Sequence, residues 1–147
     1  MKKIIVVTGS CGLVGSEAVK FFLKKNFFVI GIDNNYRKKF FGKDGDTSWL
    51  KKKLILNKNY LHNQVDIRNS KNIFKIFDKY SKNIKAVIHS AAQPSHDWAK
   101  NNLEVDFSIN ALGTVNLLNS CLKYSPKATF IYISTNKVYG DLPNILP

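Results

Sequence analysis

Three glycines spaced three residues apart lie close to the amino terminus. The segment reads Thr8-Gly9-Ser10-Cys11-Gly12-Leu13-Val14-Gly15, directly after an apolar run and before a helical pattern. In a turn of this kind Gly9 permits the tight bend, Gly12 lets the backbone approach a pyrophosphate, and Gly15 lets helix and strand pack closely. The start of the following helix would offer free N–H groups and a positive dipole end to phosphates. Glycines also serve ordinary turns, so the spacing alone leaves that alternative open.

An acidic residue follows at the distance that a dinucleotide site requires. Asp33 ends the second apolar run, close to the roughly 20-residue spacing typical of such sites. There a carboxylate accepts hydrogen bonds from the adenosine ribose hydroxyls and repels a 2′-phosphate. The combination predicts a dinucleotide site and favours NAD over NADP, although the cations Arg37, Lys38 and Lys39 lie close enough to weaken that preference.

Three further strand ends carry candidate ligand contacts: Asp66-Ile67, Ser90-Ala91-Ala92-Gln93-Pro94, and 134–140, which reads Ser-Thr-Asn-Lys-Val-Tyr-Gly. Because ligands of open α/β sheets bind at the carboxyl ends of the strands, we expect all three to border one crevice. Asp66 would then meet the adenine, and the small alanines would let a nicotinamide ribose come close. Each has an ordinary alternative, since Asp66 could cap a turn and the alanines could simply pack.

Other reactive residue types form no recognisable site. Ser95-His96-Asp97 contains the residues of a hydrolase triad, but adjacent side chains point in different directions and cannot relay a proton. We interpret this run as a polar loop over a ligand. The histidines and cysteines lack metal-ligand spacing, so we predict no metal site. Cys11 and Cys121 are expected to be small buried thiols rather than a disulfide.

The elements that would position these residues alternate between β-branched runs and helical patterns. This alternation predicts one α/β domain over residues 1–147 with a Rossmann-like, doubly wound parallel sheet of about five strands. We expect a long loop from 34 to about 60, with a short helix at 49–56, and a helix after 70 capped by Ser70. The other strands are predicted at 3–7, 27–32, ending at 65–67, 84–88 and 129–133, and the other helices at 12–25 and about 98–124.

Charge and hydropathy limit the partners. The net charge is +13, but all cations except Arg37 and Arg68 are lysines scattered along the chain. Nucleic-acid readers concentrate cations on one face and rely on arginine, so we predict no nucleic-acid partner but a general attraction for anionic ligands. No apolar run approaches the roughly 20 residues that cross a bilayer, and the run after Lys3 is too short for a signal peptide. We expect no membrane partner and a cytoplasmic protein.

Taken together, these motifs resemble the extended short-chain dehydrogenase/reductases, which are NAD-dependent sugar-nucleotide epimerases and dehydratases. The resemblance rests on the glycine turn at 8–15, Asp33, Asp66-Ile67 and the segment 134–140. It covers essentially the whole chain. Segments 91–99 and 134–141, and the loop 33–42, are most similar to members that act on CDP-sugars.

The resemblance implies NAD as cofactor, a nucleotide-sugar substrate with a CDP-sugar favoured, and a homo-oligomeric full-length enzyme. Family members oxidise a sugar carbon transiently to a ketone and return the hydride to the opposite face. Thr135 matches the catalytic Ser/Thr that binds the reacting hydroxyl, and Ser95, His96 and Lys137 are candidate sugar contacts. The implied cofactor contacts are Gly9, Ser10, Cys11, Gly12, Leu13, Val14, Gly15, Asp33, Asn34, Asp66, Ile67, Ala91, Ala92, Gln93 and Asn110.

One family feature is missing from the printed sequence. The general base of the family is a tyrosine four residues before a lysine, and none of the six tyrosines here has a lysine at that position. Tyr139 belongs to the turn after the fifth strand and cannot replace it. We therefore expect these residues to be the N-terminal part of a longer enzyme, without the sugar-binding part and inactive alone. Another epimerase or dehydratase, or a non-catalytic dinucleotide-binding module, remains an alternative.

Overall fold

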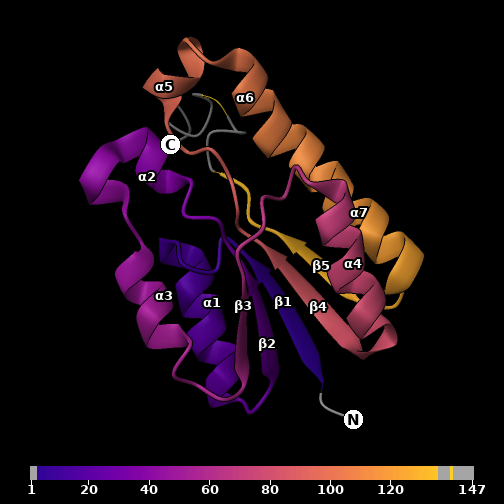
Figure 1. Cartoon of the computed structure of the whole chain (residues 1–147). Coiled ribbons are helices and arrows are strands. Elements are labelled where there is room, and N and C mark those ends of the chain that lie inside the picture. The colour runs from indigo at the N-terminus through magenta and orange to yellow at the C-terminus, as the bar shows by residue number, and fades with distance from the viewer. Residues whose placement is uncertain (1–2, 136–139, 141–147) are drawn as a thin grey trace, which may run out of the picture.

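A parallel five-stranded sheet forms the centre of the molecule (Figure 1). The computed structural model describes residues 3–135 and 140. Across the sheet the strand order is β3-β2-β1-β4-β5, which is the Rossmann order, with the switch point between β1 and β4. The prediction of a doubly wound α/β fold is confirmed. In chain order the strands are β1 (Ile4–Thr8), β2 (Phe28–Ile32), β3 (Tyr60–Asn63), β4 (Ile84–His89) and β5 (Thr129–Tyr132).

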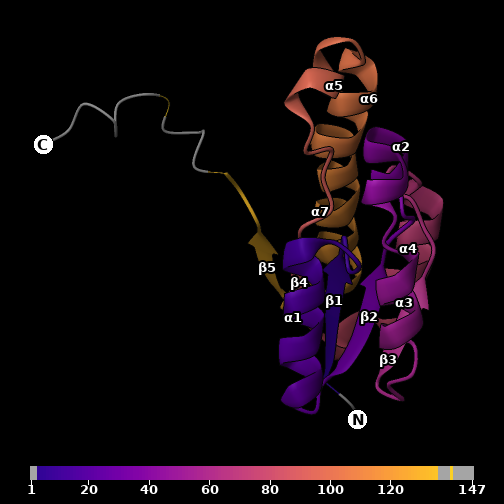
Figure 2. The same ribbon diagram turned by 90° about the vertical axis from the view of Figure 1, so that its left-hand side faces the viewer.

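Helices cover both faces of this sheet (Figure 2). On one face, α1 (Leu13–Lys24) and α3 (Ser48–Leu54) bury Val19 and Leu50 in a core with Ile5. On the other, α4 (Ser70–Tyr80) and α7 (Gly113–Tyr124) bury Phe77 and Leu117 in a core with Val6. Successive residues of a strand point to opposite faces of the sheet, and helices cover both faces here. Every residue of β1 is therefore buried, and its one polar side chain, Thr8, forms a hydrogen bond with His89.

The stretch after β2 contains more helix than expected. It forms α2 (Arg37–Phe41) and a 3₁₀ turn (Gly42–Gly45), so the prediction of a loop from 34 to about 60 is wrong in this part. The short helix predicted at 49–56 is confirmed by α3. Asn35, which has a positive φ of 57°, organises this stretch. Its side-chain oxygen accepts hydrogen bonds from both the backbone N–H and the hydroxyl of Thr47, each at 3.0 Å. One polar side chain therefore closes the loop around α2.

The expected helix from about 98 to 124 is interrupted. It consists of α5 (His96–Lys100), α6 (Leu103–Phe107), a π-helical turn (Ser108–Leu112) and α7. The side-chain amide of Asn102 donates to the carbonyl of Trp98 at 2.9 Å. This bond takes the acceptor that a continuing helix would use, and such local competition is a known property of asparagine. The chain therefore turns between α5 and α6.

Two boundaries also differ from those expected. The third strand ends at Asn63, because the N–H of Val65 bonds the carbonyl of Asn63 and turns the chain out of the sheet. The cap of α4 is Asn69 rather than Ser70, and its side chain accepts from the N–H of Asn72 at 3.1 Å. Over the described residues, no helix has the length and apolar character needed to span a membrane.

Candidate dinucleotide-binding site

A groove runs along the carboxyl edge of the sheet at the switch point between β1 and β4. The glycine turn borders it in the middle, the end of β2 and the segment after β3 at one side and the segment after β4 at the other. Of the predicted cofactor contacts, those that line the groove are Gly9, Gly12, Leu13, Val14, Gly15, Asp33, Asn34, Asp66, Ile67, Ala91 and Ala92.

The glycine turn leaves no room for side chains at two positions. Gly9 has a φ of +64°, and a Cβ there would lie 2.8 Å from the backbone nitrogen of Ala91. A Cβ at Gly15 would lie 2.0 Å from the carbonyl oxygen of Gly9. Gly12 donates to that same oxygen at 2.8 Å and begins α1 without any side-chain cap. The open N-terminus of a 12-residue helix therefore faces the groove, an arrangement that fits a pyrophosphate.

Asp33 is held rigidly at the end of β2. One carboxylate oxygen accepts from the backbone N–H of Cys11 at 2.9 Å, and the other from the N–H of Asn35 at 2.7 Å. A carboxylate offers about four lone-pair positions, so acceptor capacity remains for a ligand. Because Asp33 also lines the groove, its geometry fits a pair of ribose hydroxyls.

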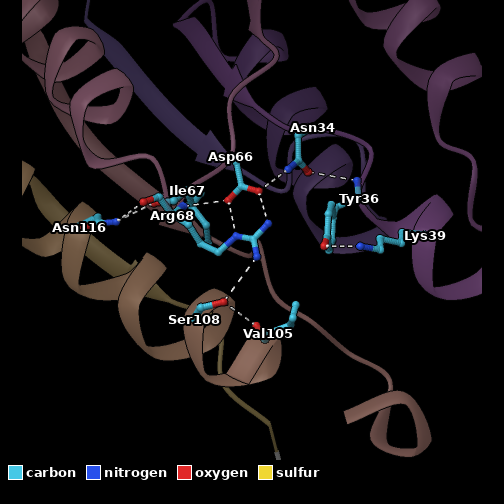
Figure 3. A network of polar contacts seen from close by, with 9 residues as sticks. All are labelled: Asn34, Tyr36, Lys39, Asp66, Ile67, Arg68, Val105, Ser108 and Asn116. Carbon is cyan, nitrogen blue, oxygen red and sulfur yellow. Dashed lines mark hydrogen bonds and ion pairs between the residues drawn. The ribbon is translucent and has the colours of Figure 1, made fainter. Parts of the chain in front are cut away.

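Asp66 lies at the centre of a polar network (Figure 3). Arg68 binds it through a 2.6 Å ion pair and through its Nε at 3.0 Å, while the amide of Asn34 donates at 3.0 Å. Burial alone would raise the pKa of Asp66, but the hydrogen bonds and charge of Arg68 lower it overall. The carboxylate is therefore ionised at neutral pH.

The same network ties this corner to the helices beyond it. Arg68 reaches the hydroxyl of Ser108 at 3.5 Å, and Asn116 of α7 donates to the carbonyls of Ile67 and Arg68 at 3.0 and 3.1 Å (Figure 3). The guanidinium also lies over the ring of Tyr36, 5.0 Å from its centroid. Segment 65–68, which left the sheet earlier than expected, is thereby fixed beside the groove.

Ser10 and Cys11 belong to the glycine turn, but neither residue lines the groove. Both are buried, and the hydroxyl of Ser10 bonds that of Tyr60 at 3.0 Å. Burial, and then the charge of Asp33, raise the pKa of the Cys11 thiol to about 11. Cys11 thus acts through its backbone N–H. Cys121 is likewise free and buried, which confirms the prediction for both cysteines.

Gln93, in the segment after β4, contacts Asn110 of the π-helical turn. Gln93 is buried, and its backbone N–H donates to the side-chain oxygen of Asn110 at 2.9 Å. Neither side chain lines the groove, whereas the neighbours Ala92 and Pro94 do. Their place in the structure is thus a supporting one, next to the predicted nicotinamide end.

The candidate sugar contacts are less well grouped. Ser95 caps α5 by accepting from the N–H of Trp98 at 3.3 Å, and His96 is exposed in the first turn. Asp97 is exposed as well and pairs with Lys100, so Ser95, His96 and Asp97 make no triad. Thr135 is exposed beyond β5, and Lys137 lies outside the described residues. Over residues 3–135 and 140, no three His, Cys, Asp or Glu side chains come together as metal ligands would.

Several groove residues were missed by the sequence reasoning. They include the aromatic residues Tyr36 and Phe40, which line the groove from α2 and contact each other with centroids 5.1 Å apart. Their spacing of four residues directly after Asp33 was a usable signal, because it places both rings on one side of a helical turn. Phe40 in turn contacts Trp98 of α5.

Comparisons with known proteins agree with this geometry. The sequence profile of the NAD dependent epimerase/dehydratase family matches residues 5–147. The chain is 36% identical to CDP-paratose 2-epimerase of Salmonella typhi over 138 residues, covering 94% of this chain and 38% of that protein. It is 29% identical to UDP-glucuronate 4-epimerase 1 of Arabidopsis thaliana, covering 92% and 30%.

A solved structure shares the fold. The UDP-Glc/GlcNAc 4-epimerase of Campylobacter jejuni superposes with a TM-score of 0.77 at 23% identity, covering 96% of this chain and 39% of that one. The chain therefore spans about two fifths, or less, of the length of the proteins it matches. The family match confirms both the predicted resemblance and the prediction of NAD as the cofactor.

Proposed function

The chain belongs to the NAD dependent epimerase/dehydratase family, and on that premise we propose that it forms the NAD-binding part of a sugar-nucleotide epimerase similar to CDP-paratose 2-epimerase. The observation that carries the proposal is the groove itself. It combines an uncapped helix N-terminus, a fixed Asp33 carboxylate and an ionised Asp66 carboxylate along one sheet edge. That series of groups suits phosphates, ribose and adenine in turn.

Each part of the groove has a distinct task in this proposal. The N–H groups at the start of α1 bind the pyrophosphate, and Asp33 binds the adenosine ribose. Asp66 and Ile67 border the adenine, and the small side chains of Ala91 and Ala92 border the nicotinamide end. When bound, NAD would supply the acceptor and donor of the hydride.

The chemistry on the sugar would start from Thr135, which would hold the hydroxyl that is oxidised. Ser95, His96 and Lys137 would contact the sugar. By similarity to CDP-paratose 2-epimerase, the reacting atom would be C2 of CDP-paratose, and inversion there would yield CDP-tyvelose. The proposal includes a homo-oligomeric full-length protein, as the family resemblance implies, and a cytoplasmic location.

A second candidate is a sugar-nucleotide 4-epimerase or dehydratase. It is favoured by the 29% identity to a UDP-glucuronate 4-epimerase and the 32% identity to a dTDP-glucose 4,6-dehydratase. A non-catalytic dinucleotide-binding module is the candidate from another class, because the printed residues contain no tyrosine followed by lysine at the fourth position.

The test uses the polypeptide encoded by the complete open reading frame and CDP-paratose carrying deuterium at C2. We expect CDP-tyvelose that retains the label, because the hydrogen leaves and returns within one active site. Turnover of UDP-glucuronate or dTDP-glucose without CDP-paratose turnover would support the second candidate. NAD binding without any turnover would support the module.

A pair of variants tests the role of Thr135 in the same assay. Thr135→Val removes the hydroxyl and is expected to lower kcat by about 100-fold, the lower range for a positioned acid–base group, without weakening NAD binding. Thr129→Val, at an exposed position in β5, is the matched control and should leave kcat unchanged.

A further inference from the structure

Asp106, near the end of α6, makes two hydrogen bonds that none of the foregoing roles explains. Its Oδ1 accepts from the side-chain amide of Gln93 at 2.8 Å and from that of Asn110 at 3.1 Å. Gln93 is 6% exposed, so the pair of bonds lies mainly inside the protein. A carboxylate therefore bridges two amides beneath the groove.

Both amides in turn hold the segment after β4. The side chain of Asn110 binds both backbone groups of Gln93, accepting from its N–H at 2.9 Å and donating to its carbonyl at 3.3 Å. The side chain of Gln93 donates to the carbonyl of Ser95 at 2.9 Å and accepts from the Ser95 N–H. Side chains of α6 and of the π-helical turn thus hold Gln93, and the side chain of Gln93 in turn holds the backbone of Ser95.

Asp106 reinforces the orientation that the backbone partners give these amides. An amide can be turned over by exchanging its oxygen and nitrogen, but an ionised carboxylate only accepts. Both NH₂ groups must therefore face Asp106, which leaves both amide oxygens free for the N–H groups of Gln93 and Ser95. Hydrogen bonds to an ionised acceptor are also stronger than neutral ones.

We propose that Asp106 is a positioning residue for the nicotinamide end of the groove. It acts through Gln93 and Asn110 on the backbone between Ala92 and Pro94, both of which line the groove. The inference rests on the proposed cofactor site. It adds that the two halves of that site are held by separate networks, because the contacts of Asp33 do not pass through Asp106.

Because separate networks hold the two halves of the site, the role of Asp106 can be tested by comparing the affinities of two ligands. ADP-ribose carries the adenosine, the diphosphate and the second ribose of NAD but no nicotinamide ring, so it reports on the glycine turn, Asp33 and Asp66 without any contact of that ring. Loss of Asp106 should weaken the binding of NAD and leave that of ADP-ribose unchanged. A general loss of stability would weaken both ligands alike.

The experiment measures the Kd of the 147-residue chain for NAD and for ADP-ribose by calorimetry. Asp106→Leu, similar in size without an acceptor, is expected to raise the ratio of the NAD Kd to the ADP-ribose Kd about tenfold. Asp106→Asn keeps an acceptor oxygen without the charge and should raise the ratio about threefold. Asp97→Asn, at an exposed acid on α5, is the matched control and should leave the ratio unchanged.

An unchanged ratio in both Asp106 variants, or an equal loss for the two ligands, would overturn the role. If Asp106→Leu does not fold, Asp106→Asn decides the question alone. A wild-type chain that binds ADP-ribose but not NAD contradicts only the placement of the nicotinamide end. A wild-type chain that binds neither ligand contradicts the proposed function and this inference together.

Discussion

The ring of Phe40 contacts the ring of Trp98, with centroids 4.7 Å apart and planes inclined at 64°. Phe40 belongs to α2, which follows β2, and Trp98 belongs to α5, which follows β4. These strands lie on opposite sides of β1 in the sheet. Because Phe40 lines the groove, the contact joins the two halves of the protein directly beside the predicted cofactor.

Removal of this contact should speed the release of the cofactor. Phe40→Ala is expected to raise the dissociation rate of NADH several-fold, because an aromatic pair contributes about 0.5–1.5 kcal/mol and its loss opens the side of the groove. Stopped-flow displacement of NADH by NAD, followed by nucleotide fluorescence, measures the rate. Phe74→Ala removes a ring that contacts Tyr124 instead of the groove and serves as control. Equal rates in the two variants would argue against the contact.

A substitution at Gly12 should weaken cofactor binding with little effect on folding. Its backbone angles, φ −78° and ψ 175°, suit any residue, and an added Cβ would lie 3.2 Å from the carbonyl oxygen of Gly9. Gly12→Ala should shift the Tm by no more than about 3 °C and weaken NAD binding at least about tenfold, because the methyl group keeps the pyrophosphate from the backbone.

Gly15→Ala provides the contrast to that variant. Its Cβ would lie 2.0 Å from the same oxygen, so we expect the folded state itself to be lost or strongly destabilised. Thermal unfolding followed by circular dichroism distinguishes the two outcomes. Unchanged NAD binding in Gly12→Ala would show that no phosphate group approaches this turn.

His89 should make the fold sensitive to acid. Burial lowers its pKa from the ordinary value of 6.5 to about 4. Its Nδ1 lies 2.7 Å from the hydroxyl of Thr8, and its Nε2 lies 2.9 Å from that of Thr114. Since Thr114 already donates to the carbonyl of Asn110, Nε2 carries the hydrogen and Nδ1 accepts from Thr8. Protonation would turn Nδ1 into a donor, so the buried Thr8 hydroxyl would lose the acceptor for its own hydrogen.

The sign of the effect follows from these two pKa values. Between pH 6.5 and 4 the unfolded chain binds the proton and the folded chain does not, so the free energy of unfolding falls as the pH falls. The full effect of the shift is about 3 kcal/mol. Urea unfolding of His89→Gln should show a weaker pH dependence over this range, and His96→Gln, at an exposed site, should match wild type. Part of the pH dependence should remain in His89→Gln because of His62, whose pKa is lowered by burial and then by Lys51. An unchanged slope in His89→Gln would refute the assignment.

The outer side of α7 is expected to cause self-association. Val115, Leu118 and Leu122 follow one another at helical spacing and are 47%, 44% and 75% exposed. Apolar patches of this kind favour association in spite of the net charge of +13. Light scattering at tens of micromolar should show oligomers that decrease in the double variant Leu118→Lys/Leu122→Lys. Ile55→Lys/Leu56→Lys adds the same charge at the end of α3 and should have little effect. A monomeric wild-type chain would contradict this prediction.

The sequence sufficed for the strands that are buried on both faces. Strands β1, β2 and β4 lie within about one residue of their predicted bounds, because coverage by two helix layers requires an uninterrupted apolar run. The edge strand β5 matches its predicted bounds equally well, although most of its residues are exposed. The end of β3 was predicted wrongly, because apolar residues continue past the point where the strand leaves the sheet. Val65 and Ile67 are apolar but line the groove and pack beyond the sheet, so hydropathy alone extended the strand too far.

The site was predictable where a motif encodes backbone geometry. The glycine turn and Asp33 depend on residues at fixed local spacing, and the structure brings both to the groove. Contacts between distant segments leave no such pattern. Nothing local in the sequence pairs Phe40 with Trp98, or gives Gln93 a carboxylate partner in Asp106. Roles implied by resemblance for Thr135 and Lys137 remain predictions.

The most direct test is a calorimetric titration of the chain with NAD and with NADP. The Asp33 carboxylate, held by Cys11 and Asn35, leaves room for ribose hydroxyls but repels a 2′-phosphate. We predict that NAD binds at least about tenfold more tightly, a difference of about 1.4 kcal/mol. Asp33→Ala should remove this preference, whereas Asp44→Ala, at an exposed acid, should retain it. NADP binding as tight as that of NAD, or tighter, in the wild-type chain would contradict the assignment of this groove.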